Sequence, residues 1–403
     1  MILTIDRLGH HGDGIAEGPI YVPLTLPGEV VEGTVEGGRM AAPRILTPSP
    51  DRVRAPCPHY AACGGCGVMH GSDAFVADWK AGVVRQALAA QGIDAPIRHL
   101  HISPPSSRRR ATLAGKRTKS GALVGFHARA SGTVVAIPSC RLLHPVLMDA
   151  LPVFAAITGA GASRSATLAL AATLTDDGID LVVEGGKPMT PDLFADLVRL
   201  AGDGNLARLT WGADVVAVRR TPGLTIAGIR FEPPAGAFLQ ATKHGEAALQ
   251  AAVAEGVGSA GTIADLFAGC GTFALSLARG AAVHAVENDA DMLAALSRAA
   301  RSNPGLRTLT TETRDLFRRP LLKHDLRRFD AVVIDPPRAG AEAQVAEVAQ
   351  SALSAVAMVS CNPVTFAHDA RLLCDAGFRP DWIDVVDQFR WSSHVEMAAA
   401  FRR

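Results

Sequence analysis

The residue best placed to do chemistry is Cys361, in the segment SCNP that follows the apolar run AVAMVS. That run is typical of a buried strand, so the cysteine is expected at the carboxyl end of a strand, where open α/β sheets bind ligands. A thiolate at the edge of a cleft can act as a covalent nucleophile. Cys374, by contrast, lies inside an apolar helical pattern and is expected to be a small buried hydrophobe.

Two carboxylates are expected near Cys361. Asp335 ends the strand-like run FDAVVID and begins the turn DPPRAG, in which two prolines stiffen the backbone. Glu396, in HVE, begins the last strand-like run, and it reaches the same sheet edge if that strand runs antiparallel. A carboxylate in that place suits general-base catalysis, and an ordinary surface glutamate is the alternative for Glu396.

The segment DLFAGCGTF, residues 265–273, predicts a turn between a strand and a helix. Its glycines let the backbone turn tightly and approach a ligand. The next strand ends at Glu287, roughly 20 residues after Asp265, where an acid typically hydrogen-bonds the ribose of a nucleoside cofactor. A charge at a helix N-terminus is the alternative for Glu287. Because the spacing is not GxGxxG, no pyrophosphate needs cradling, which favours S-adenosylmethionine over a dinucleotide.

Four further cysteines have the composition of a metal site. Cys57, Cys63 and Cys66 form a C-x5-C-x2-C pattern, and Cys140 follows in IPSC. Four thiolates suit either tetrahedral zinc or a four-iron cluster, and an accidental set of free thiols is the alternative. The C-x3-C-x2-C triplet of radical adenosylmethionine enzymes is absent, so a structural role is expected.

The charge distribution predicts an RNA or DNA partner. The net charge is only +1, but residues 95–148 contain no acidic residue. The basic residues there are Arg98, Arg108, Arg109, Arg110, Lys116, Arg117, Lys119, Arg129 and Arg141. The five from Arg108 to Arg117 are the expected phosphate contacts, and the alternative is that they pair with acids elsewhere in the fold.

Three regions are expected along the chain. Residues 1–54 alternate short β-type runs with Gly- and Pro-rich turns, which is typical of a small closed OB-like barrel. Residues 55–235 mix a helical segment at 78–92 with β-type runs, as in an α+β domain. Residues 236–403 alternate strand and helix, which predicts an α/β domain with a doubly wound parallel sheet and a final antiparallel edge pair.

The composition is that of a soluble globular protein, with 48% hydrophobic and 20% charged residues. No apolar stretch has the length of a membrane span, and the N-terminus lacks the basic start and apolar run of a secretory signal. We therefore expect a cytoplasmic protein with no membrane partner, and a monomer.

Taken together, these segments resemble the bacterial RNA 5-methyluridine methyltransferases, particularly the iron–sulfur branch that acts on 23S rRNA. FLQ, DLFAGCGTF, DPPRAG, SCNP and HVE follow in that family's order, while CPHYAACGGCGVMH and IPSC resemble its cluster-binding segments. LGHHGDGIAEGPIYVPLTLPGE resembles its TRAM domain. The resemblance implies a class I (Rossmann-like) methyltransferase domain, an N-terminal TRAM barrel and a central iron–sulfur domain.

The resemblance also implies roles for individual residues. Cys361 would add to C6 of a uridine so that C5 can accept a methyl group, and Glu396 would then remove the C5 proton. It favours a [4Fe-4S] cluster over zinc on the four cysteines. The S-adenosylmethionine site would be lined by Gln240, Phe267, Thr272, Glu287, Asp315 and Asp335. Thr272 and Asp315 stand where the family commonly has asparagine, which weakens those two assignments.

Ribosomal RNA is the expected substrate, and the nearest alternative is the same reaction on tRNA. An amino-group methyltransferase is a second alternative, but it needs no nucleophile and usually has an aromatic residue after D/N-P-P, where this chain has Arg338. A third is an RNA-binding or assembly factor with weak catalysis, against which intact Cys361 and Glu396 argue.

Overall fold

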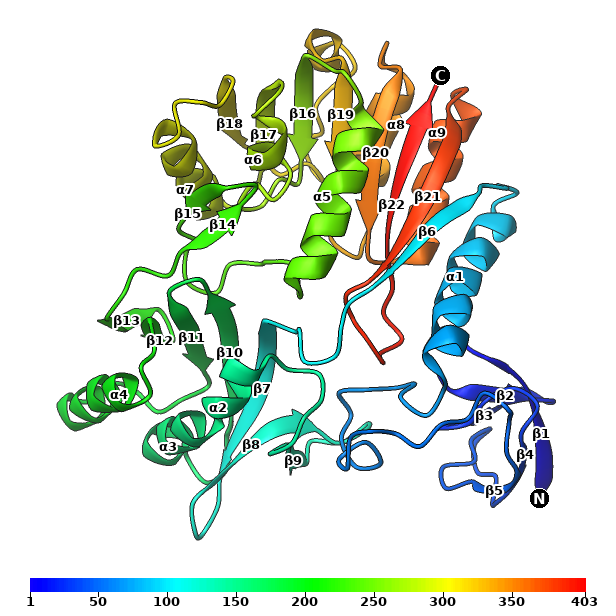
Figure 1. The fold of residues 1–403 in the computed structure, drawn as a ribbon, viewed down its shortest axis with the longest axis vertical. Coiled ribbons are helices and arrows are strands. Elements are labelled where there is room, and N and C mark those ends of the chain that lie inside the picture. The colour runs from blue at the N-terminus through cyan, green and yellow to red at the C-terminus, as the bar shows by residue number, and fades with distance from the viewer.

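The computed structural model describes all 403 residues, which form three large β-sheets and one separate hairpin (Figure 1). The N-terminal sheet has the strand order β3-β2-β1-β4-β5. Its strands are β1 (Ile2–Leu8), β2 (Gly14–Ala16), β3 (Ile20–Val22), β4 (Val30–Glu32) and β5 (Arg44–Thr47). The end strands β3 and β5 are not hydrogen-bonded to each other, but Tyr21 of β3 bonds through its backbone to Gly38 and Met40, in the segment between β4 and β5. The closed barrel expected from the sequence stays a prediction. A small core, which includes Ile5, Val31 and Met40, still fills the concave side.

The central sheet has the order β13-β12-β11-β10-β7-β8-β9 and is antiparallel apart from the β11–β12 pair. Its strands are β7 (Arg110–Arg117), β8 (Ala122–His127), β9 (Val134–Ala136), β10 (Thr167–Thr175), β11 (Gly178–Glu184), β12 (Arg208–Trp211) and β13 (Asp214–Val218). Helices α2 (Pro145–Asp149), α3 (Leu151–Gly161) and α4 (Pro191–Asp203) accompany it. Phe154 of α3 and Leu197 of α4 are fully buried in the core that these helices share with the sheet.

The third sheet has the order β18-β17-β16-β19-β20-β22-β21-β6. Its strands are β16 (Thr262–Leu266), β17 (Ala282–Glu287), β18 (Leu309–Thr313), β19 (Ala331–Ile334), β20 (Ala355–Ser360), β21 (Arg379–Asp387), β22 (Glu396–Arg402) and β6 (Ile97–Ile102). The first five are parallel to one another, and β19 and β20 have the continuous apolar character that is typical of buried parallel strands.

Helices cover both faces of this third sheet, and each face has its own core. On one face lie α5 (Lys243–Val257), α6 (Ala274–Leu277) and α7 (Ala290–Arg301), together with the hairpin of β14 (Leu224–Ile226) and β15 (Ile229–Phe231). On the other lie α1 (Asp73–Ala90), α8 (Glu342–Ala349) and α9 (Pro363–Asp375), while the short 3-10 turn η1 (Asp325–Arg328) precedes β19. No helix combines the length and the apolar character that crossing a bilayer requires.

The expected antiparallel pair at the end of the chain is present, but it does not form the edge of the sheet. Strand β22 lies between β20 and β21, and β6 pairs in parallel with β21 on the outside. This pairing joins residues almost 290 positions apart, and no local pattern encodes it. Two ion pairs reinforce it: the partly exposed Arg98 binds the buried Asp384, and the buried Lys80 of α1 binds Asp387 at 2.6 Å. Thus α1 and β6 precede the central sheet in the chain but pack on the third sheet.

The chain enters and leaves the central sheet through two segments that lie together. The hydroxyls of Ser103 and Thr242 are 2.8 Å apart, and the backbone N–H of Arg109 donates to the carbonyl of Ala241. The central sheet is therefore connected to the third sheet by two adjoining segments.

Candidate active site

Three reactive side chains lie where the central parallel strands of the third sheet end, a place that we call the catalytic edge. Asp335 directly follows β19, and Cys361 directly follows the neighbouring strand β20. Strand β22 runs antiparallel to β20, with Ser360 opposite Met397. This register brings Glu396, the first residue of β22, to the end of β20 where Cys361 lies. The structure therefore brings together the three residues that the motifs DPPRAG, SCNP and HVE single out.

Hydrogen bonds connect the three loops that carry these residues. The Asn362 side chain caps α9 by accepting from Val364 N, and its Nδ2 donates to the carbonyl of Arg338 at 2.9 Å. The Arg338 guanidinium also reaches Nδ1 of His394, 3.1 Å away. Each loop is thus held by its neighbour, which fixes the position of Cys361 relative to Asp335 and Glu396.

The site is acidic and poorly solvated, and this changes the acidity of each group. Burial and the nearby Asp335 raise the pKa of Glu396 to about 8. Burial raises the pKa of Asp335 to about 7. Burial, followed by the charges of Glu396 and Asp335, raises the pKa of Cys361 to about 11, and Arg338 opposes that shift. A carboxyl that titrates near neutrality can accept a proton, but the free thiol is protonated at neutral pH.

The turn after β16 forms the expected place for a nucleoside. Gly269 and Gly271 have positive φ angles of 55° and 88°, and a Cβ at Gly271 would lie 2.4 Å from a methyl group of Leu296. Glu287, at the end of β17, accepts from the backbone N–H groups of Gly269, Asn288 and Asp289. The glycine turn and the acid expected to bind ribose are therefore held together.

Asp265, inside the motif DLFAGCGTF, is a buried acid to which the sequence pattern assigned no role. It is fully buried, and neither carboxyl oxygen has a hydrogen-bond partner. Burial, then the charge of Asp335, raises its pKa to about 8. Orphaned buried carboxyl oxygens are costly unless a ligand satisfies them. S-adenosylmethionine carries an ammonium and a sulfonium cation, so this acidic strand edge fits that cofactor.

The other residues expected around the cofactor have varied surroundings. Phe267 is partly exposed, and its ring lies 5.4 Å from the ring of the half-exposed Phe317. Asp315 is partly exposed and accepts from the backbone of Phe317 at 3.0 Å. Thr272 is partly exposed, and Gln240 is buried. The structure thus places Phe267 and Asp315 beside one apolar patch and Gln240 in the interior.

Comparison with known proteins places the chain in a family. The family model described as tRNA (Uracil-5-)-methyltransferase matches residues 224–403. A protein named uncharacterized RNA methyltransferase from Rhizobium meliloti (strain 1021) is 41% identical over 410 residues, which cover 100% of this chain and 99% of that protein. RlmD of Shewanella amazonensis, a 23S rRNA (uracil(1939)-C(5))-methyltransferase, is 32% identical, with 99% and 95% covered. This chain belongs to the RNA uracil-5 methyltransferase family.

A solved structure shows the same fold. It is the tRNA (uracil-54, C5)-methyltransferase of Pyrococcus abyssi in complex with S-adenosyl-L-homocysteine, which has a TM-score of 0.77 at 21% identity and covers 100% of this chain and 99% of its own. The third sheet is accordingly a class I methyltransferase fold. The chain is an S-adenosylmethionine-dependent RNA uracil-5 methyltransferase. An amino-group methyltransferase is excluded as the alternative.

The four cysteines expected to bind metal in this methyltransferase lie around one small cavity. Cys57, Cys63, Cys66 and Cys140 line it together with apolar side chains that include Tyr60, Met69 and Phe126. Backbone N–H groups of Gly65 and Leu142 point at the sulfurs of Cys63 and Cys140, each at 3.4 Å. Burial, then the charges of the other thiols, raises the pKa of Cys66 to about 12. No three His, Cys, Asp or Glu side chains are arranged at ligand geometry, so the structure assembles the four cysteines without showing a metal site.

The basic segment of this methyltransferase divides into paired and unpaired residues. Arg109 is 3% exposed; it pairs with Glu246 of α5 and donates to the carbonyl of Gln240. The expectation that Arg109 contacts phosphate is therefore wrong, because a buried, paired guanidinium is not available to RNA. Arg98 is likewise paired, with Asp384 and Glu255. The other basic residues of the segment have no carboxylate partner: Arg108, Arg110, Lys116, Arg117, Lys119, Arg129 and Arg141.

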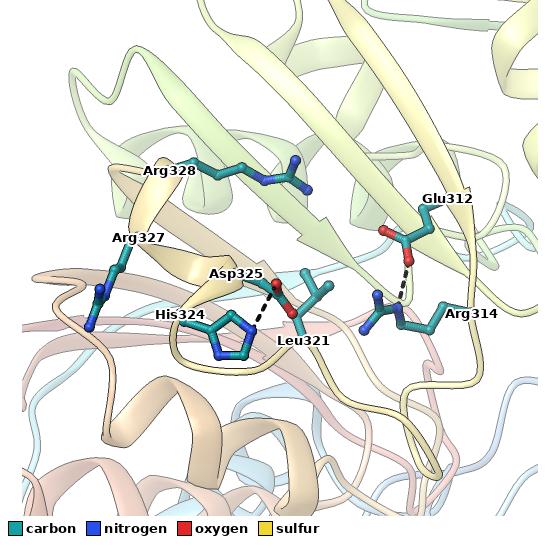
Figure 2. A pocket seen from close by; sticks show the side chains of 7 residues that line it. All are labelled: Glu312, Arg314, Leu321, His324, Asp325, Arg327 and Arg328. Carbon is teal, nitrogen blue, oxygen red and sulfur yellow. Dashed lines mark hydrogen bonds and ion pairs between the residues drawn. The ribbon is translucent and has the colours of Figure 1, made fainter.

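A separate cavity of about 450 Å³ lies beside the edge strand β18 and the turn η1 (Figure 2). None of the expected site residues lines it. Its carboxylates are already engaged, since Glu312 pairs with Arg314 and Asp325 with His324. We assign it no part in the reaction.

Proposed function

We propose that this methyltransferase modifies C5 of a uridine in 23S ribosomal RNA through a covalent bond between Cys361 and C6 of the base. The observation that carries the proposal is the meeting of Cys361, Asp335 and Glu396 at the ends of adjacent strands. The preference for ribosomal RNA is supported by the similarity to RlmD over nearly the whole chain. The same reaction on tRNA is the second candidate, because the matched family model and the Pyrococcus abyssi protein carry tRNA in their names.

The chemistry requires a nucleophile because C5 of uracil is too weak a nucleophile to take a methyl group directly. In the proposed reaction the thiol of Cys361 loses its proton to solvent, its Sγ bonds to C6, and the electron pair of the C5–C6 double bond moves toward C5. When bound, S-adenosylmethionine would supply an electrophilic methyl group, whose bond to the cofactor sulfur breaks as the methyl group joins C5. Glu396 then takes the proton from C5, the double bond re-forms, and the C6–S bond breaks to release the thiolate.

The acidity of the site supports these roles. A carboxyl group whose pKa is raised to about 8 is a stronger base than an ordinary glutamate, which suits Glu396 for removing a carbon-bound proton. The pKa values of Asp335 and Asp265 are raised to about 7 and 8, so a cationic cofactor bound beside them would favour their ionised forms and be stabilised by the negative charge that develops. The residues proposed to bind the cofactor are Gln240, Phe267, Thr272, Glu287, Asp315 and Asp335, and we add Asp265.

We further propose that Cys57, Cys63, Cys66 and Cys140 hold a [4Fe-4S] cluster. Their shared apolar cavity and the N–H groups directed at two sulfurs support a thiolate-bound group. Such a cluster would relieve the repulsion between thiolates and give this loop-rich region a fixed shape. The domain division proposed from the sequence is 1–54 for a TRAM-like RNA-binding unit, 55–235 for the cluster region and 236–403 for the methyltransferase, with α1 and β6 packed on the last.

The substrate is tested by incubating the protein with labelled S-adenosylmethionine and unmodified ribosomal RNA or tRNA, and then mapping the methylated base. We expect 5-methyluridine in 23S rRNA. Label in tRNA alone would transfer the proposal to the second candidate. Glu396→Gln is expected to accumulate a denaturant-stable, methylated protein–RNA adduct, and absence of any adduct in that variant would contradict the proposed base.

The unpaired basic residues are the proposed phosphate contacts, and Arg109 offers a matched control. Replacing both Lys116 and Arg117 with Ala is expected to weaken RNA binding and to lower the slope of log affinity against log salt by about 1–2. Arg109→Ala should instead lower the melting temperature, because it leaves Glu246 buried without its partner, and should keep the wild-type slope. An unchanged slope in the Lys116/Arg117 variant would remove these two residues from the RNA surface.

A further inference from the structure

Gln388 is a buried amide between two residues that the proposed function uses. It follows β21 directly and is 1% exposed. Its Nε2 donates to the carboxylate of Glu396 and to the side-chain oxygen of Gln240. Its Oε1 accepts from the backbone N–H of Ala241 at 2.7 Å. Both N–H groups and the carbonyl are therefore engaged, and two of the three partners are the proposed base and a proposed cofactor residue.

The fold makes room for this amide and holds its backbone. A Cβ on Gly245 of α5 would lie 2.7 Å from the Cβ of Gln388, so glycine is needed there for the two elements to approach. The preceding residue, Asp387, pairs with the buried Lys80, whose Nζ also donates to the carbonyl of Phe389. The chain on both sides of Gln388 is thus attached to α1.

The loop that follows Gln388 is also bound by the segment after Cys66. The carbonyl of Trp391 accepts from the backbone N–H groups of Gly67 and Val68, which come directly after Cys66. Trp391 is buried against Tyr60 and Met69. Gln388 therefore has little freedom to move, which is what a group that orients another side chain requires.

We infer that Gln388 is a positioning residue that holds the Glu396 carboxylate ionised and directed at the reacting base, and couples it to the cofactor residue Gln240. An N–H donor favours the charged form of a carboxyl group, and it is the only such stabilising contact that Glu396 has. The other titratable groups near Glu396 are Asp335, which follows β19, and Cys361, which follows β20. The charge of Asp335 disfavours that of Glu396, while the thiol of Cys361, whose pKa is raised to about 11, is neutral at pH 7. Helix α5 packs against Gln388 at Gly245. The acid next to this glycine, Glu246, is paired with Arg109.

The inference rests on the proposed role of Glu396, so its test measures the ionisation of that carboxyl directly. In the full-length protein, the protonated-carboxyl infrared band of Glu396 is titrated with pH and assigned by its loss in Glu396→Gln. Gln388→Met keeps the size of the side chain and removes both donors. We expect the pKa of Glu396 to rise by about one, the acidic limb of the turnover profile to move to higher pH, and turnover at pH 7 to fall about tenfold.

A matched control separates positioning from packing. Gln344 of α8 is another fully buried glutamine, bonded to the backbone N–H and C=O of Leu321, away from the catalytic edge. Gln344→Met should lower thermal stability and leave the pKa of Glu396 and the acidic limb unchanged. If Gln388→Met behaves in the same way as Gln344→Met, the positioning role is wrong.

Two further variants keep the outcomes distinct. Gln388→Glu retains the shape if Gln388→Met does not fold, and it should raise the pKa of Glu396 further because two carboxyls would then share one proton. An unmoved Glu396 titration in both variants overturns the inference. Full turnover in Glu396→Gln would instead reject the base assigned in the proposed function, while the titration would still report on Gln388.

Discussion

Two regions of the molecule bury cysteine thiols, and their neighbours differ. Cys361 lies alone at a strand end, next to two carboxyl groups and one exposed arginine. The four cysteines of the cavity lie next to one another, to apolar side chains and to backbone N–H groups. In both regions burial is the largest cause that raises the thiol pKa. Burial therefore does not distinguish the two regions, and the neighbouring groups do.

The neighbours indicate what each region needs in order to form thiolates. The four clustered thiols repel one another when ionised, so a bound metal cation is the partner that would let them ionise together. Cys361 is opposed by carboxylates and is proposed to lose its proton only when a cation and the uridine occupy the edge. The first arrangement suits a permanent structural group, and the second suits a nucleophile that is unreactive in the empty enzyme.

The sharpest way to separate the two regions is to remove the lone thiol. Cys361→Ser is expected to lower methylation by at least about a thousandfold, because a serine hydroxyl is a far poorer nucleophile for C6. The melting temperature should stay near that of the wild type. Cys374→Ser, in helix α9, is the matched control and should retain turnover. An active Cys361→Ser enzyme would reject the covalent mechanism.

Removing one of the four clustered thiols should lower thermal stability strongly and turnover less, the reverse of the effect expected for Cys361→Ser. Cys66→Ser is expected to lose bound iron and to lower the melting temperature by roughly 5–10 °C, because the metal stabilises only the folded chain. Turnover of the molecules that remain folded should change less than in Cys361→Ser. Metal analysis of anaerobically purified protein checks this prediction, and stoichiometric zinc without iron would replace the cluster with a zinc site.

The pH dependence tests the carboxyl next to the lone thiol. Since Glu396 must be ionised to accept a proton and its pKa is raised to about 8, turnover at saturating RNA should rise about tenfold from pH 7 to pH 9. The direction follows from the base form dominating above the pKa. Glu396→Gln should lack this limb. A flat profile across that range in the wild type would show that Glu396 does not titrate in the rate-limiting step.

The smallest expected effect concerns the repulsion between the thiol and its neighbour. Removing the charge of Glu396 should lower the pKa of Cys361, so iodoacetamide should alkylate Cys361 in Glu396→Gln roughly three- to tenfold faster at about pH 9.5, where Glu396 of the wild type is ionised. Peptide mapping measures this rate, with Cys374 in the same sample as the reference. Equal alkylation rates for Cys361 in the two proteins would mean that the charge of Glu396 does not raise the pKa of Cys361.

The sequence predicted the catalytic edge well, because each motif follows its own strand. DLFAGCG, DPPRAG and SCNP each follow an apolar run, and parallel strands bring their carboxyl ends to one edge whatever the order of the strands. The relatives confirm the family, and the solved structure confirms the class I fold. The roles of Cys361 and Glu396 remain predictions that the geometry supports.

What the sequence could not predict depends on pairings between distant residues. The contact of Arg109 with Glu246 crosses more than 130 positions, so the basic run looked uniform although one member is buried. Gln388 follows a strand, as the predicted residues do, but an amide in the run VDQF has no motif to mark it. Asp265 could have been singled out from the sequence, since it lies four residues before Gly269 of the glycine turn, but its burial without a hydrogen-bond partner is visible only in the structure.

The adjoining segments on either side of the central sheet have a consequence for engineering. Because Ser103 and Thr242 touch, the ends of the intervening stretch lie as close together as those of an inserted domain that tolerates exchange. We expect the part of this stretch that forms the central sheet to be replaceable by a different RNA-binding insert if two features are kept: the β14–β15 hairpin, which packs in the core of the third sheet, and the contacts of Gln240 and Ala241 with Gln388. A cut at residue 236 would instead remove β6 and leave β21 as an unpaired edge, which favours aggregation. The positions at which the chain can be cut and rejoined are therefore those where Ser103 and Thr242 touch, and not the domain boundaries read along the sequence.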